Sequence, residues 1–201
     1  MQITQITEID KKRIRIELED ARVFVLYKGE ARGRNLKEGE ELSPEAYESI
    51  QKEILVKRAC KRVMFLLEKM NRTESQLRDK LRQGFYQEEV IDQAIEYVKG
   101  YHYVDDSRYA MNYVRYQKER KSKRQIEMEL RKKGIEKAVI TVALEEEYAE
   151  QNEETLILKW VEKKHYSKES SDCKEKQKIY QFLMRKGFQS NDILHVLDYL
   201  T

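Results

Sequence analysis

The stretch that decides the fold is Ser122–Leu144, SKRQIEMELRKKGIEKAVITVAL, because its pattern occurs three times in the chain. A similar stretch precedes it at Ser75–Ile95 (SQLRDKLRQGFYQEEVIDQAI), and another follows it at Ile179–Leu197 (IYQFLMRKGFQSNDILHVL). Self-similarity at an interval of about 50 residues is typical of one supersecondary unit used in tandem. The sequence therefore predicts three copies of a helical unit.

Each copy has the same internal plan. An apolar pair four residues apart marks a short amphipathic helix, since residues at that spacing share one helix face; the pairs are Leu77/Leu81, Ile126/Leu130 and Ile179/Leu183. A glycine follows each pair, and a second apolar pair then opens another helix. Because glycine adopts the left-handed conformation at little cost, we expect it to end the first helix in every copy, at Gly84, Gly134 and Gly187.

The N-terminal segment has a different periodicity. Residues Arg13–Glu19 (RIRIELE) and Arg22–Lys28 (RVFVLYK) alternate apolar and polar side chains, which indicates two strands of a hairpin. Residues 2–8 are expected to add a third strand. Ser43 followed by Pro44 is a helix N-cap with proline at the first position, and this helix should run to about residue 70.

The predicted fold class is mainly α: an elongated array of three tandem three-helix units preceded by a small antiparallel β element. The expected domains are 1–42, 43–100, 101–150 and 151–201. Each bundle should be about 20–25 Å across, so the array would extend roughly 60–75 Å. Two capping boxes, Thr73 with Gln76 and Ser122 with Gln125, mark helix starts.

Composition indicates a helical, solvent-rich protein. The chain has 201 residues, of which 38% are charged, and a formal net charge of +3. No apolar run approaches the roughly 18 residues of a membrane helix, and the N-terminus lacks the features of a signal peptide. Cys60 and Cys173 have no partner spacing and are expected to be reduced thiols. We therefore expect a cytoplasmic protein that does not bind membranes.

Charge is segregated along the chain. Residues 51–84 and residues 113–137 each hold ten basic and four acidic side chains, whereas residues 85–112 hold two and six. The second basic block also contains tyrosines. Basic residues among aromatics are typical of surfaces that bind phosphates or acidic proteins. The alternative is that charged helices merely keep a thin array soluble.

The sequence contains only weak candidates for catalytic residues. Asp105 and Asp106 form a carboxylate pair with His102 nearby, but helix capping accounts for both aspartates. The sequence has no Walker-type loop, GxSxG, HExxH or CxxC motif. We therefore expect a protein that is not an enzyme, with no catalytic residues, no metal site and no cofactor.

Three motifs together carry a family resemblance. DDSRYA (Asp105–Ala110), Leu130 with Lys133-Gly134-Ile135, and the closing KGF (Lys186–Phe188) resemble the RecX family of regulators of the RecA recombinase. The similarity covers residues 54–200, and the N-terminal strands are similar to the extra segment of some members. The chain departs from the family at Lys118–Ile126 (KERKSKRQI), where many relatives place a glycine.

The resemblance implies a partner and an activity. It implies binding in the deep groove of the RecA filament on DNA, with suppression of filament growth, ATPase, strand exchange and co-protease activity. A second hypothesis is a DNA-binding protein that acts through helix-turn-helix-like pieces of the repeats, on single- or double-stranded DNA, without RecA. A third is a bare helical scaffold.

The candidate binding residues are basic side chains in the two basic blocks. We expect a monomer that presents them on one inner face toward phosphates or acidic RecA side chains. They are Arg58, Lys61, Arg62, Arg78, Arg82, Arg115, Lys118, Lys123, Arg124, Arg131 and Lys132.

Overall fold

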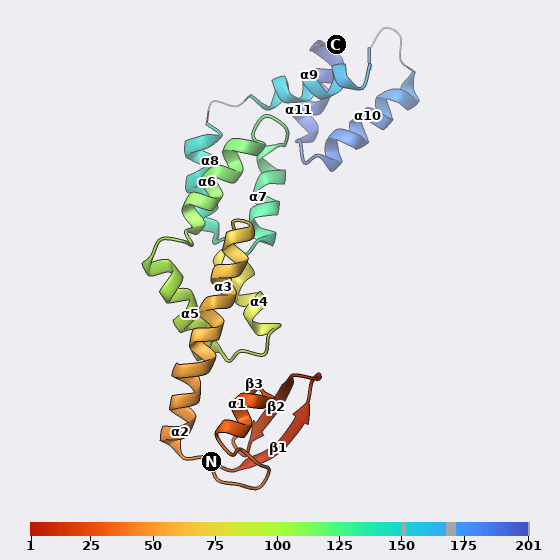
Figure 1. The fold of residues 1–201 in the computed structure, drawn as a ribbon. Coiled ribbons are helices and arrows are strands. Elements are labelled where there is room, and N and C mark those ends of the chain that lie inside the picture. The colour runs from red at the N-terminus through yellow and green to blue at the C-terminus, as the bar shows by residue number, and fades with distance from the viewer. Residues whose placement is uncertain (150–151, 168–171, 201) are drawn as a thin grey trace. The chain divides into compact units, whose positions relative to one another are not determined.

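The structure is a computed structural model that describes residues 1–149, 152–167 and 172–200 (Figure 1). The chain separates into two compact units, an N-terminal unit Met1–Asp105 and a C-terminal unit Asp106–Thr201. The predicted class, mainly helical with a small antiparallel sheet in front, is confirmed. The four predicted domain boundaries and the elongation of the array stay predictions. Within the described residues, no helix is both long and apolar enough to cross a membrane.

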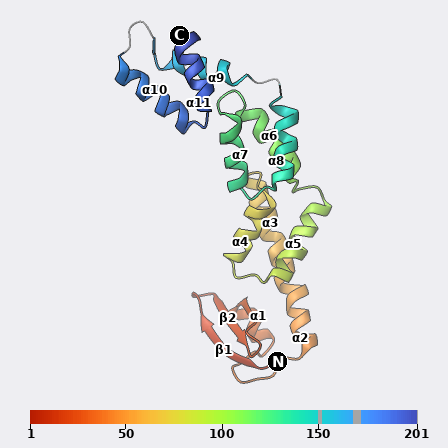
Figure 2. The ribbon, with the colours of Figure 1, turned by 180° about the vertical axis from the view of Figure 1, so that it is seen from behind.

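The predicted three-stranded sheet is present. Strands β1 (Ile3–Glu8), β2 (Arg13–Leu18) and β3 (Val23–Tyr27) are antiparallel in the order β1-β2-β3. The period-two pattern places Ile14, Ile16 and Leu18 of β2 in the core. A short helix, α1 (Lys28–Gly33), follows β3 and contacts it (Figure 2). Six residues are too few to show a helical period, so the sequence did not predict α1.

The long first helix is also confirmed. Three consecutive segments keep helical backbone from Pro44 to Lys69: α2 (Pro44–Ser49), the π-helical η1 (Ile50–Val56) and α3 (Lys57–Lys69). The Ser43 hydroxyl accepts a hydrogen bond from the Ala46 N–H at 3.2 Å, which satisfies one of the free donors of the first turn. The π segment was not predicted.

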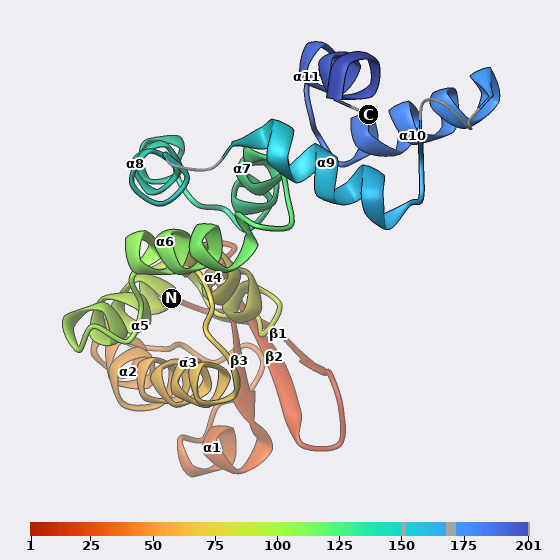
Figure 3. The same cartoon turned by 90° about the horizontal axis from the view of Figure 1, so that it is seen from above.

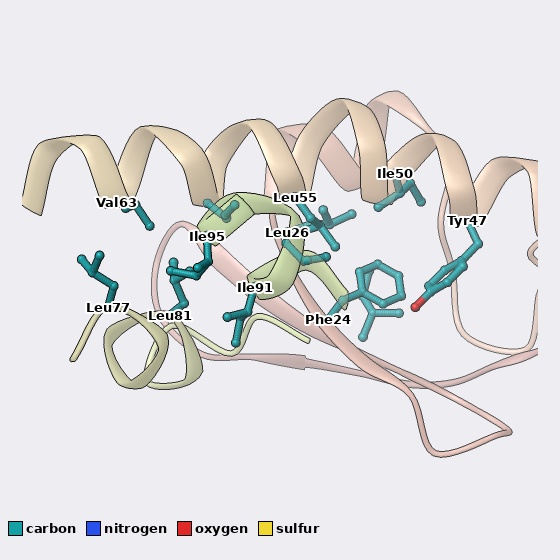
Figure 4. Packing of buried hydrophobic residues seen from close by; sticks show 14 of the residues in the cluster. Phe24, Leu26, Tyr47, Ile50, Leu55, Val63, Leu77, Leu81, Ile91 and Ile95 are labelled. Carbon is teal, nitrogen blue, oxygen red and sulfur yellow. The ribbon is translucent and has the colours of Figure 1, made fainter. Parts of the chain in front are cut away.

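One hydrophobic core joins the sheet to the first three-helix repeat, which consists of α3, α4 (Glu74–Arg82) and α5 (Glu88–Gly100). Phe24 of β3 lies below Ile50 of the long helix, and Leu26 lies near Leu55 (Figure 4). Further along the same helix, α4 and α5 complete the core with Leu77, Leu81, Ile91 and Ile95 (Figure 4). Three strands are only marginally stable alone, so this contact stabilises the β element.

The C-terminal unit contains the second and third repeats. The second consists of α6 (Asp106–Gln117), α7 (Lys123–Lys132) and α8 (Lys137–Glu147). The third consists of α9 (Glu153–Lys163), α10 (Cys173–Arg185), α11 (Ser190–His195) and the π-helical η2 (Val196–Leu200). Helix α6 packs mainly against α8, and α9 packs against α11 and η2 (Figures 2 and 3). Both repeats share one core.

The glycine prediction is wrong for the first repeat. Gly134 and Gly187 adopt φ angles of +79° and +86°, but in the first repeat the positive φ, +61°, belongs to Phe85. The helix-ending hydrogen bonds explain the shift. In each repeat an N–H five residues after the last buried leucine donates to that leucine's carbonyl oxygen at 3.3 Å; the donors are Tyr86, Ile135 and Phe188.

The position of the turn is therefore fixed by its distance in sequence from the leucine. The left-handed residue is always the fourth after that leucine. In the first repeat a glycine occupies the third position after Leu81, so Gly84 is the structural counterpart of Lys133 and Lys186. The same geometry ends α5 and α9, where His102 and His165 are left-handed. Two of the three histidines, His102 and His165, are thus the left-handed residues that end a helix.

The two capping boxes differ. Thr73 and Gln76 exchange both expected hydrogen bonds. Ser122 caps α7 by accepting from the Gln125 N–H at 3.2 Å, but the Gln125 side chain donates to Glu129 of the next turn. The prediction of a capping box at Ser122 is therefore only half right, because a competing partner one turn along the helix takes the glutamine side chain.

Candidate binding surface

A groove of about 720 Å³ opens in the N-terminal unit where β2 and β3 meet α3 and the C-terminal end of α4. Its walls come from strands and helices that are far apart in the sequence. Because the shared core fixes the sheet against the long helix, the groove is a built feature of the fold. It is lined by Arg13, Val25, Tyr27, Arg58, Lys61, Arg62, Phe65, Lys80, Gln83, Gly84 and Tyr86.

The lining is basic and contains no acidic residue. Arg13 is neutralised by Asp10, whose Oδ2 lies 2.7 Å from the arginine Nε. Lys61, Arg62 and Lys80 are exposed, and no carboxylate of the described residues lies within ion-pair distance of them. These three side chains give the groove its net positive charge.

Arg58 has a structural role within the groove. Its guanidinium donates to the Val25 carbonyl oxygen at 3.2 Å and to Glu30 at 2.7 Å, and it lies 4.7 Å from the centre of the Tyr27 ring. The side chain thus fastens α3 to β3 and α1. With its charge paired and two of its N–H groups donating to other elements, Arg58 forms part of the wall of the groove.

Three aromatic rings, those of Tyr27, Phe65 and Tyr86, lie among the cations that line the groove. Tyr27 and Phe65 are 42% and 44% exposed, which is high for side chains that border a hydrophobic core. Two cations, Arg62 and Lys69, lie over the Phe65 ring. Burial raises the pKa of Tyr86, partly opposed by the charges of Arg58 and Arg62, so its hydroxyl stays protonated.

The other two predicted residues of the N-terminal unit do not line this groove. Arg78 forms ion pairs with Glu74 at 2.8 Å and with Asp92 of α5 at 2.6 Å. Arg82 pairs with Asp79 and with Glu88, the first residue of α5. The structure thus brings Arg58, Lys61 and Arg62 together and separates them from these two arginines, which bind α4 to α5.

In the C-terminal unit, half of the predicted residues are held by local contacts. Arg115 pairs with Glu147 of α8, and the Lys118 ammonium donates to the Glu147 carbonyl oxygen at 2.9 Å. Arg131 pairs with Glu127 one turn earlier on α7 at 2.6 Å. These contacts join α6 to α8 or support α7.

The other half are exposed cations of α7. Lys123 and Arg124 lie in its first turn and Lys132 in its last. No carboxylate of the described residues forms an ion pair with these side chains. Their role in binding stays a prediction.

Cations stack on aromatic rings in both repeats of the C-terminal unit. The Lys133 ammonium lies 5.4 Å from the centre of the Tyr113 ring, and that of Lys186 lies 4.8 Å from the Trp160 ring. Both lysines occupy the third position after the last buried leucine. The counterpart in the first repeat is Gly84, which has no side chain to cover this place and lines the basic groove instead.

Sequence reasoning missed Arg13, Tyr27, Phe65, Lys80 and Tyr86. Phe65 carried a signal, because it follows Lys61 by four residues and so shares its helix face. The other four come from β2, β3, α4 and the loop that follows α4. Their meeting depends on how the sheet packs against α3, which no periodicity describes.

Comparison with known proteins identifies the three repeats. Family models described as the first, second and third three-helix domains of RecX match residues 59–97, 105–144 and 152–197. The chain belongs to the RecX family. These matches fall on α3–α5, α6–α8 and α9–α11, so the family's units are the repeats of the structure.

Relatives and solved structures agree with this assignment. The chain is 35% identical over 164 residues to the regulatory protein RecX of Caldanaerobacter subterraneus, covering 81% of each chain. It is 26% identical over 189 residues to that of Clostridium beijerinckii, covering 92% and 88%. A crystal structure of regulatory protein RecX matches with a TM-score of 0.59 at 27% identity, covering 98% of both chains. RecX from Lactobacillus salivarius matches with a TM-score of 0.56 at 26% identity, covering 72% of this chain and 97% of the other.

Membership in the RecX family implies a regulatory role connected to RecA. The similarity to the first of these structures extends through the residues before the first family-model segment, because it covers nearly the whole chain. The β element is thus part of the matched structure.

Proposed function

We propose that this protein inhibits or modulates RecA by binding in the groove of the RecA–DNA filament. Binding there suppresses the ATPase, strand-exchange and co-protease activities of the filament. The protein acts by contact rather than by catalysis. Membership in the RecX family carries this proposal, and the exposed cations of α3 and α7 support it.

The contact is electrostatic in this proposal. Lys61 and Arg62 of α3 and Lys123, Arg124 and Lys132 of α7 are the predicted residues that keep their charge available in the described structure. Phosphates of the filament DNA and acidic side chains of RecA are both suitable targets, since each offers anionic oxygens. Arg58, Arg78, Arg82, Arg115, Lys118 and Arg131 contribute by holding the helices in place.

The test is the DNA-dependent ATPase of RecA. Adding the protein should reduce the rate in a dose-dependent manner, and the protein should sediment with the filaments. The variant Lys123→Glu/Arg124→Glu/Lys132→Glu should need at least about tenfold more protein for the same inhibition, because each reversed charge replaces an attraction with a repulsion.

The matched control is Lys137→Glu/Lys159→Glu/Lys174→Glu, which reverses three exposed lysines elsewhere in the C-terminal unit. Its inhibition should stay close to that of the parent protein. An unchanged ATPase with no co-sedimentation would exclude RecA as the partner, and equal effects of both triple variants would exclude α7 as the contact.

Direct binding of DNA through the repeats is the second candidate function. The exposed cations at both ends of α7, the middle helix of its repeat, favour it. In that case affinity for DNA alone should fall steeply with salt, and the α7 triple variant should reduce the slope. An interaction with RecA that is insensitive to salt, together with no DNA binding, would exclude this candidate.

A further inference from the structure

The groove of the N-terminal unit is lined by residues of the sheet together with residues of the first repeat, so the repeats alone do not form it. Three of its eleven lining residues, Arg13, Val25 and Tyr27, come from β2 and β3, which precede the first family-model segment. The structure therefore offers a candidate site that is separate from α7 and whose function does not require RecA.

The charge of the groove selects an anionic occupant. Lys61, Arg62 and Lys80 project from two helices around one cavity, and none of the eleven lining residues is acidic. Carboxylates near the groove are already used, since Asp10 pairs with Arg13 and Glu30 with Arg58. A chain of phosphates satisfies three neighbouring cations better than isolated carboxylates, because its charges recur at short, regular intervals.

The aromatic rings decide between a nucleic acid and an acidic protein. Tyr27 and Phe65 stand on facing elements of the groove, β3 and α3, and each leaves more than two fifths of its surface exposed. Exposed rings within a basic groove are the platform on which unpaired bases stack. An acidic peptide would gain little from them, and duplex DNA keeps its bases inside the helix.

Gly84 lines this groove without a side chain of its own. In the other two repeats the equivalent residue is a lysine that stacks on a ring of the first helix, Lys133 on Tyr113 and Lys186 on Trp160. Gly84 has no side chain at that place, and the Tyr86 ring packs against it, 3.0 Å from where a Cβ would be. The first repeat thus lacks the cation–ring contact that the second and third repeats have at this point.

We propose that the groove between the β-sheet and α3–α4 binds a single-stranded nucleic acid. Lys61, Arg62 and Lys80 contact its phosphates, and Tyr27 and Phe65 stack on its bases. Arg58 holds the Tyr27 ring in place from the protein side.

The experiment measures fluorescence anisotropy of a short labelled oligothymidylate with the full-length protein, in the absence of RecA. Binding should weaken with salt and exceed binding to a duplex of the same length. Lys61→Gln/Arg62→Gln/Lys80→Gln should weaken binding at least tenfold at low salt. It should also reduce the slope of log affinity against log salt by about 2, since each phosphate contact to a single strand contributes about 0.7.

Phe65→Leu tests the stacking separately. It should weaken binding about fivefold or more and leave the salt slope unchanged, because it removes a ring and no charge. Tyr27→Leu should act in the same way. Thermal melting of each variant checks that the fold is intact, and a Phe65→Tyr variant, which keeps a ring, should restore affinity.

The control for charge is Arg32→Gln/Lys37→Gln/Lys52→Gln, which removes one arginine and two lysines from exposed positions of the same unit outside the groove. It should keep the parent affinity to within about twofold. Equal losses in both triple variants, or no effect of either ring variant, would overturn the proposal, as would preferential binding of polyglutamate. Since RecA is absent, failure here leaves the ATPase test of the proposed function unaffected.

Discussion

The Ser122 hydroxyl donates a hydrogen bond to the Lys186 carbonyl oxygen at 2.8 Å, although 64 residues separate them. Ser122 is fully buried and caps α7, so one side chain starts the middle helix of the second repeat and holds the end of α10 in the third. The next residue, Gly187, lies so close that a Cβ built on it would be 2.6 Å from the Ser122 Oγ. The two repeats are therefore interlocked at this point.

Gly187→Ala should destabilise the protein by about 2–4 kcal/mol. The left-handed backbone, φ +86°, costs an alanine about 1–2 kcal/mol, and the clash with Ser122 adds to it. Gly39→Ala is the control, because Gly39 has φ +81° but nothing within 4 Å of its Cβ position. Urea unfolding should show the larger loss for Gly187→Ala; equal losses would mean that the close approach to Ser122 contributes nothing.

Ser122→Ala should cost about 2 kcal/mol, because it removes the N-cap of α7 and leaves the Lys186 carbonyl without the serine donor. Ser43→Ala provides the comparison: this exposed serine caps α2 by accepting from Ala46. Its loss should be nearer to 1 kcal/mol. Both free energies of unfolding come from the same urea experiment, and a smaller loss at Ser122 than at Ser43 would contradict the interlock.

Arg58→Ala should destabilise the N-terminal unit by about 2 kcal/mol. The change leaves the Val25 carbonyl without the guanidinium donor and removes the ion-pair partner of Glu30, in a pair whose side chains are only 20% and 29% exposed. Lys61→Ala, three residues along the same helix, should change stability by less than about 0.5 kcal/mol. If the two variants melted at the same temperature, Arg58 would be a surface cation like its neighbour.

Acid should weaken the N-terminal unit through Glu74. Burial alone would raise the pKa of this carboxyl, but hydrogen bonds from Lys99 and Arg78 outweigh it and lower the pKa below 4.5. A lowered native pKa stabilises the fold above pH 4.5, and this contribution is lost as the pH falls through the native value. Glu74→Gln should therefore cost about 1 kcal/mol or less at neutral pH, and the cost should be smaller at an acidic pH below 4.5.

Chemical unfolding at both pH values tests this linkage. Glu96→Gln is the control, since Glu96 is exposed and makes no ion pair with the described residues. It should show the same stability as the parent at each pH. A Glu74→Gln deficit that persists in acid would assign the effect to packing rather than to charge.

Small-angle scattering tests the predicted elongation of the array. A compact chain of 201 residues should have a radius of gyration of about 17 Å. Three bundles in a row should give a clearly larger value. A radius near 17 Å would show that the repeats fold back on one another.

The sequence was sufficient for most of the fold, because local rules determine most of it. Period-two and period-four spacing located the strands and helices, and Ser43-Pro44 located the start of the long helix. The error at Gly84 has a physical cause: the turn is set by its distance from Leu81, and the sequence places a glycine one position too early. A phenylalanine then accepts the left-handed conformation at a cost in free energy.

The binding surface was predicted less well, because charge in a sequence does not show which cations are already paired. Arg58, Arg78 and Lys61 look alike in the basic block, yet the first two form ion pairs within the N-terminal unit and the third is exposed without a carboxylate partner in the described structure. Carboxylates such as Glu30 and Asp92 neutralise them from other elements. Only tertiary packing brings those partners into reach.

The shared core of the N-terminal unit also limits how the gene can be shortened. A version that starts at Pro44 would retain all three family-model segments, which begin at residue 59. It would nevertheless uncover Ile50 and Leu55, which β3 covers in the intact protein. An apolar strip of that kind promotes aggregation during expression, so a minimal version of this regulator must keep its first strands.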